Sequence, residues 1–161
     1  MRKAVQLISL WLLPLVAIST DSSASPFFQM RLVLDAPSNH STQMVLVSKG
    51  KNGDRKETLD VQDTVLLDET ALSSATATTD EISHDPCIEI VFNKEGAKRF
   101  AQLTRQNIGN RLAIIIGGQV YCAPVIRSEI TGKGEISGSF SLQEARNLAA
   151  TISAILPNGS R

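Results

Sequence analysis

An unbroken apolar run, Leu112 to Ile116, constrains the fold of this chain more than any other feature. Such a run is typical of a central strand that is buried on both faces. Gly117 and Gly118 follow it directly, and two glycines permit the positive φ angles of a two-residue hairpin turn. The segment Gln119 to Ala123 is expected to return as the partner strand, until Pro124 limits further pairing. The run therefore predicts a central β-hairpin.

Two amphipathic helices are predicted, one before and one after this hairpin in the sequence. Asn93 can cap the first helix, whose apolar residues recur at helical spacing until the stop signal at Gly109. Ser141 and Glu144 can form a capping box at the start of the second helix, which Pro157 ends. Short strands are predicted at Phe28 to Leu34, Gln43 to Ser48, Thr58 to Val61, Thr64 to Leu67, Thr76 to Ile82, Cys87 to Phe92 and Glu135 to Phe140.

These elements indicate an α+β fold, a two-layer sandwich with two helices on one face of a mainly antiparallel sheet. Residues 25–63 are expected to form an N-terminal β subregion that packs on the main unit, residues 64–157. Ala71 to Ala75 is expected to form one helical turn, and Thr131 to Gly134 a glycine-rich turn. Residues 158–161 are expected to be a frayed tail.

Residues 1–24 have the order of a signal peptide. Two basic residues open the chain, the mostly apolar segment Ala4 to Ile18 follows, and small residues precede a cleavage point after Ala24. A membrane anchor is the alternative, but the run is short for a span and contains Pro14. No second long apolar run occurs, so we expect a periplasmic or secreted protein with no stable membrane span after processing.

Several short motifs occur in a fixed order along the second half of the chain. They are Asn93-Lys94-Glu95-Gly96-Ala97, Phe100, Thr104, Leu112-Ala113-Ile114, Gly118-Gln119-Val120, Ala123-Pro124-Val125-Ile126, Ile136-Ser137-Gly138-Ser139-Phe140-Ser141 and Glu144-Ala145. In this order they resemble the head subdomain in the first periplasmic domain of the SecD/SecDF protein-export family. The resemblance covers residues 64 to 156 and implies a ferredoxin-like layout of the sandwich. Gly117 stands where the family usually has Asp, which changes the chemistry of the turn and not the expected fold.

The residue pattern gives no support to catalysis or to metal binding. His40 and His84 lie in separate predicted loops and lack ligand spacing with a cysteine. Gly132-Lys133-Gly134 precedes a helix, but the spacing fits neither phosphate-binding fingerprint. The serines and threonines between Ser73 and Ser83 lack a nucleophile motif. We therefore expect a protein that is not an enzyme and that holds no cofactor and no metal.

The charge balance argues against nucleic acid as a partner. The chain has 16 Lys+Arg against 16 Asp+Glu, which gives no general attraction to polyanions or anionic lipid. A basic outer face is predicted on the first helix, at Lys94, Lys98, Arg99 and Arg105. A solvated helix face is the usual explanation of such a pattern.

Cys87 and Cys122 are the only cysteines. An exported chain meets an oxidising compartment, where paired cysteines often form a disulfide. Cys87 alternates out of phase with Ile88, whereas Cys122 is in phase with Val120, which argues for opposite sheet faces. Spacing alone does not establish a bridge, so the bridged and the free forms both stay open.

The resemblance implies contact with unfolded exported polypeptide, because the periplasmic domain of SecD is thought to capture emerging chains. SecD itself works through transmembrane helices coupled to the proton gradient, so the resemblance implies the fold and does not imply the proton-driven motor function. The first hypothesis is an exported binding module for unfolded or translocating polypeptide. The alternative is a stand-alone regulatory or interaction domain for another exported protein.

The binding surface is expected at an apolar strip between the first helix and the hairpin, or at an exposed strand edge. Edges of short strands can accept an added strand through main-chain hydrogen bonds, without demanding a particular sequence. Tyr121, Val125 and Ile126 are the candidate contacts, because they lie beside Pro124, where regular pairing should end. The alternative is that these residues are ordinary core.

Overall fold

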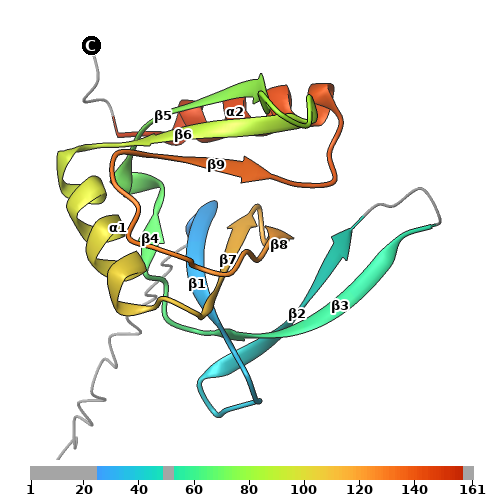
Figure 1. Cartoon of the computed structure of the whole chain (residues 1–161), viewed down its shortest axis with the longest axis vertical. Coiled ribbons are helices and arrows are strands. Elements are labelled where there is room, and N and C mark those ends of the chain that lie inside the picture. The colour runs from blue at the N-terminus through green and yellow to red at the C-terminus, as the bar shows by residue number, and fades with distance from the viewer. Residues whose placement is uncertain (1–24, 49–52, 158–161) are drawn as a thin grey trace, which may run out of the picture.

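The structure, a computed structural model, describes residues 25–48 and 53–157, so the expected signal peptide and C-terminal tail lie outside the described residues. Figure 1 shows the arrangement of its helices and strands. In chain order they are β1 (Phe28–Leu34), β2 (Ser41–Ser48), β3 (Arg55–Gln62), β4 (Leu67–Asp68), the 3-10 helix η1 (Glu69–Ala71), β5 (Leu72–Thr79), β6 (Pro86–Phe92), α1 (Lys94–Gln106), β7 (Arg111–Ile116), β8 (Gln119–Cys122), β9 (Lys133–Ser137) and α2 (Leu142–Ile155).

The larger sheet has six strands in the order β3-β2-β8-β7-β1-β4. Its end strand β3 also pairs with β1, at Val33↔Val61 and Leu34↔Asp60, so five of the strands close into a small barrel. The strands pair antiparallel except for β2 and β8, which are parallel. Strands of the expected N-terminal subregion, residues 25–63, thus share one sheet with the central hairpin.

The smaller sheet has three strands in the order β5-β6-β9, all antiparallel. Figure 1 shows this sheet stacked on one end of the barrel, with α2 against it and α1 along one side of both. The main hydrophobic core lies between the two sheets and the helices, and a second, smaller core fills the barrel.

The α+β class is confirmed, but the single sheet of a ferredoxin-like sandwich is wrong, because the strands divide between two sheets. The reason is visible in β7, which is buried on both faces as predicted. Its residues Ala113 and Ile115 point into the barrel core, whereas Ile114 and Ile116 point into the core between the sheets. A strand with two apolar faces suits a barrel wall as well as it suits the centre of an open sheet.

Two local expectations are also wrong. The segment Ala71 to Ala75 is not a helical turn: the 3-10 helix ends at Ala71, and β5 begins at Leu72 to pair with β6. The expected turn Thr131 to Gly134 already contains the start of β9, in which Gly134 pairs with Ile90. A Cβ on this glycine would meet the Ile90 side chain at 3.5 Å, so the residue belongs to a packed strand.

The predicted helix caps are confirmed. The side chain of Asn93 accepts a hydrogen bond from the Gly96 N–H (2.8 Å), and its backbone N–H donates to the Ala71 carbonyl (3.0 Å). Ser141 and Glu144 form the capping box, with hydrogen bonds of 3.2 and 2.7 Å. These caps fix where each helix starts relative to the sheets.

Candidate functional site

An apolar cleft of about 260 Å³ lies between the two sheets and α1, and we call it the inter-layer cleft. Its inner wall consists of core side chains from both layers and the helix, which are Met30, Ile90, Phe100, Leu112, Ile114 and Ile136. Its outer wall is the segment that follows β8, which contributes Pro124, Val125, Ile126, Arg127, Ser128 and Ile130. The cleft is therefore a gap in the main core that opens to the surface.

The outer wall is held in place by hydrogen bonds to the end of α1 and the start of β7. The Ile126 N–H donates to the Asn110 carbonyl (2.9 Å), and the Ile126 carbonyl accepts from Gly109 (2.8 Å). Further along, the Ile130 N–H donates to Oγ1 of Thr104 (3.0 Å). Thr104 is fully buried, and its hydroxyl donates in turn to the Phe100 carbonyl (2.8 Å). The buried hydroxyl of Thr104 on α1 thus fixes the far end of the outer wall.

Arg111 fixes the near end of this wall. Its Nε donates to the Ala123 carbonyl (3.0 Å), and its two terminal nitrogens bind the Glu57 carboxylate at 2.5 and 3.1 Å. These hydrogen bonds from Arg111 lower the pKa of Glu57 and raise that of Arg111. The guanidinium therefore joins β7, β3 and the segment after β8.

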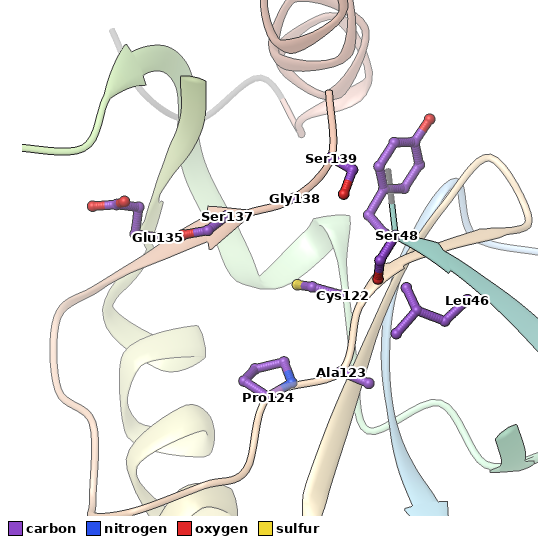
Figure 2. Close-up of a pocket in the computed structure, with 10 residues that line it drawn as sticks. Leu46, Ser48, Cys122, Ala123, Pro124, Glu135, Ser137, Gly138 and Ser139 are labelled. Atoms are coloured by element: carbon purple, nitrogen blue, oxygen red, sulfur yellow. The ribbon is translucent and has the colours of Figure 1, made fainter. Parts of the chain in front are cut away.

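A second hollow, of about 330 Å³, lies between β9 and the end of β8, and we call it the edge hollow. Figure 2 shows Glu135, Ser137, Gly138 and Ser139 on one side of it and Cys122, Ala123 and Pro124 on the other. Leu46, Ser48 and Tyr121 complete its lining. The two hollows share Cys122, Pro124 and Glu135, so they are adjacent.

The three residues predicted to contact polypeptide are divided between these hollows. Val125 and Ile126 line the inter-layer cleft, whereas Tyr121 lines the edge hollow. Val125 is 45% exposed, but Ile126 is only 4% exposed and belongs to the main core. The ring of Tyr121 packs against that of Phe140 with centroids 6.1 Å apart. Sequence reasoning missed Ile130, which is 36% exposed and whose position follows from a hydrogen bond to a distant helix.

The predicted turn residues Gly117 and Gly118 join β7 to β8, with φ angles of +56° and +80°. The Gly117 N–H also donates to the Phe27 carbonyl (2.8 Å), which ties the turn to the start of β1. A Cβ at position 118 would meet nothing within 4 Å, so only its backbone conformation demands glycine there.

The two cysteines are free thiols in the structure. Cys122 packs against the main core, whereas Cys87 is buried near Glu135, Asp80 and Glu89 on the other face of the smaller sheet. Burial raises the pKa of Cys87 to about 11, with the Glu135 carboxylate adding to the effect, and it raises the pKa of Cys122 to about 12. Such thiols are poor nucleophiles at neutral pH.

The described residues contain no group of three His, Cys, Asp or Glu side chains placed to hold a metal ion. Among those same residues, no helix is long and apolar enough to cross a bilayer. On the basic face of α1, Lys98 pairs with Glu95 (3.7 Å) and Arg99 donates to the Leu66 carbonyl (3.0 Å). The inter-layer cleft is lined mainly by apolar side chains and suits binding of such side chains, whereas the lining of the edge hollow includes Glu135 and three serines.

The fold is that of a two-layer α+β domain, and comparisons with known proteins identify its family. The sequence model of the family SecDF, P1 head subdomain, matches residues 43–156. The chain therefore belongs to the SecD/SecDF family and contains its head subdomain. This confirms the resemblance that the sequence motifs indicated.

Two relatives show how much of the family the chain represents. It is 46% identical over 90 residues to protein translocase subunit SecD of Sebaldella termitidis, which is 55% of this chain and 22% of that protein. It is also 46% identical over 88 residues to protein translocase subunit SecDF of Thermus thermophilus, which is 54% of this chain and 12% of that protein. The chain thus spans about a fifth or less of the length of these relatives.

Solved SecDF structures share the fold. One, described as a membrane component that enhances protein export, superposes with a TM-score of 0.62 at 28% identity and covers 80% of this chain and 62% of that one. A crystal structure of SecDF in a super-membrane-facing form gives a TM-score of 0.64 at 29% identity and covers 80% of this chain and 19% of that one.

Proposed function

We propose that this protein is an exported, non-enzymatic binding module that contacts unfolded or translocating polypeptide through the inter-layer cleft. Its relatives are named as protein translocase subunits, and a related structure is described as enhancing protein export. On this proposal the domain acts in the periplasm after removal of residues 1–24, and its partner is an exported polypeptide. It works without a cofactor.

The apolar cleft is the observation that carries this proposal. Its outer wall exposes Val125 and Ile130 beside a lining of core side chains, so an apolar side chain from another polypeptide can be buried there. An unfolded chain supplies such side chains without a folded shape to match. Binding is expected to be weak, because ordering a flexible chain offsets much of the contact free energy.

A titration of isotopically labelled protein with an unlabelled, permanently unfolded client, followed by NMR, tests the proposal. We expect chemical-shift changes to cluster at the outer wall, around Val125 and Ile130. The double variant Val125→Ser/Ile130→Ser should bind roughly tenfold more weakly, from about 0.7 kcal/mol for each partly exposed side chain.

Ile82→Ser is the matched control. Ile82 is 91% exposed and lines neither hollow, so its loss removes the same kind of side chain from elsewhere on the surface. This variant should bind the client like the parent protein. Equal weakening by both changes, or an absence of shifts at the outer wall with millimolar client, would contradict binding in the cleft. A single folded partner in place of unfolded clients would favour the regulatory alternative.

A further inference from the structure

Strand β9 forms one edge of the smaller sheet. In its order β5-β6-β9, β9 pairs with β6 on one side, and no strand of the described residues pairs with its other side. At the opposite edge, α2 packs against β5 and Ser153 Oγ donates a hydrogen bond to the Ala75 carbonyl (2.9 Å). An open edge presents unpaired backbone groups that can accept a further strand.

The register of β6 and β9 shows which backbone groups face outward. Just beyond the ladder, the Phe92 N–H donates to the Gly132 carbonyl (3.3 Å). Hydrogen-bonded pairs alternate along an antiparallel ladder, so Gly134 and Ile136 bond to β6. Glu135 and Ser137 then point their N–H and C=O groups away from β6. Both residues line the edge hollow, as Figure 2 shows, so there is space beside these groups.

We propose that the open edge of β9 binds an extended segment of polypeptide as a fourth strand, hydrogen-bonded to the backbones of Glu135 and Ser137. The segment has alternating side chains, apolar toward the inter-layer cleft and cationic toward the opposite face. This inference rests on the proposed function, because it specifies how the polypeptide is held and which segments are preferred.

The inner face of the added strand adjoins the cleft. Gly134 and Ile136 lie on the core-facing side of β9 and line the inter-layer cleft. Side chains of a neighbouring strand point to the same side as the residues they flank, so every second residue of the bound segment enters apolar surroundings. Gly134 has no side chain to fill this space.

The outer face of the added strand meets a predominantly negative surface. Lys133 pairs with Glu89 (2.5 Å) and also interacts electrostatically with Glu81 and Glu135, so this one cation faces several carboxylates, and Asp80 lies beside Glu135. A Lys or Arg on the outer face of the bound segment would lie next to Glu135 across the strand pair. Opposite charges in such cross-strand pairs are favourable and like charges are unfavourable.

Amide hydrogen exchange, measured by NMR, tests the proposal with defined probes. The first probe is a heptapeptide that alternates Val with Lys; the second has Glu in place of Lys; the third is the first with N-methyl groups on alternate residues. With the Val/Lys peptide near saturation, the amides of Glu135 and Ser137 should exchange about tenfold more slowly, as new hydrogen bonds form. The N-methylated peptide should give no such slowing, and the Val/Glu peptide should bind more weakly.

Two variants separate the backbone and charge contributions. Glu135→Pro removes an outward N–H while keeping the bonds from β6 to Gly134 and Ile136, so the slowing at Ser137 should be lost. Glu135→Lys should weaken binding of the Val/Lys peptide by about two- to fivefold and improve binding of the Val/Glu peptide. Asp54→Lys makes the same charge change at an exposed position off β9 and should alter neither affinity. If Glu135→Pro fails to fold, the Glu135→Lys variant and the three peptides still test strand addition at β9.

Each outcome distinguishes this inference from the proposed function. Shifts at Val125 and Ile130 without slowed exchange at Glu135 and Ser137 would overturn strand addition and leave cleft binding intact. An absence of shifts at both places would overturn both. The amides of Glu135 and Ser137 could also exchange slowly without peptide, and more slowly as the protein concentration rises. That result would identify a second copy of this chain on the edge and overturn the proposal.

Discussion

Replacing Gly96 by alanine is expected to destabilise the protein, although the same change inside a helix usually stabilises it by about 0.5–1 kcal/mol. Gly96 is buried in the first turn of α1, against the backbone of η1. A Cβ there would lie 2.0 Å from the Ala71 carbonyl oxygen and 2.8 Å from its carbon. These are backbone atoms, so a rotamer change cannot relieve the overlap.

The expected loss of stability follows from the movement that this overlap requires. Forcing an extra carbon into a packed contact costs about 1–3 kcal/mol. Moving α1 away from η1 also stretches the bond from the Asn93 N–H to the Ala71 carbonyl, which contributes about 1 kcal/mol. The gain in helix propensity offsets about 1 kcal/mol. We therefore expect Gly96→Ala to lower the free energy of unfolding by about 1–3 kcal/mol.

Urea denaturation followed by far-UV circular dichroism measures this effect. With an m-value of about 1.5 kcal/mol/M, the midpoint should fall by roughly 0.7–2 M. Gln102→Ala, at an exposed position on the same helix, is the control and should leave the midpoint nearly unchanged. A Gly96→Ala variant as stable as the parent, or more stable, would refute the close approach of α1 to η1.

Three further predictions concern the turn, the ion pair and the thiols. Gly118→Val should lower stability by about 1–3 kcal/mol in the same urea assay because of its positive φ, whereas Gly118→Asn, which tolerates that conformation, should lose less. The Arg111 hydrogen bonds hold the pKa of Glu57 below its ordinary 4.5, so the stability they contribute is present above that pH and is lost as pH falls through the lowered value. When the free energy of unfolding is measured against pH, Glu57→Gln should remove this loss at acid pH. The loss should be under about 1 kcal/mol, because the pair is partly exposed. Cys87 and Cys122 should react slowly with a thiol reagent at pH 8 in native protein and yield two thiols in urea without reductant, whereas a disulfide would yield none.

Features encoded by neighbouring residues could be predicted from the sequence. The capping box at Ser141 and the cap at Asn93 depend on side chains within three residues, and the structure has both. The Leu112 to Ile116 run is buried throughout, as its composition indicated. In each case the free energy that decides the local structure comes from contacts within one element or its turn.

The division into two sheets could not be predicted in this way. The barrel closes through two residue pairs between β1 and β3, and a single register pair, Leu46↔Val120, joins β2 to β8. Such pairings depend on the packing of distant strands, and an alternating pattern suits either a barrel wall or an open sheet. Within the candidate site, Val125 and Ile126 were predicted from an expected end of pairing at Pro124, but an isolated bridge between Arg111 and Val125 continues the pairing beyond that residue. The edge of β9 was obscured because Gly134 is typical of a turn.

The two-sheet arrangement explains why the cleft and the open edge occur together. The barrel uses the edges of its five strands to close on itself, whereas β9 enters the smaller sheet as its last strand and leaves one side unpaired. A single segment, residues 123–132, connects β8 in the barrel to β9 in the smaller sheet, and it forms the outer wall of the cleft on its way. Both ends of this wall are fixed to the barrel and helix side, through Arg111 and Thr104. The inter-layer cleft therefore lies where the chain crosses from the barrel to the smaller sheet. Its outer wall is anchored to the barrel and α1, whereas the unpaired edge of β9 belongs to the smaller sheet.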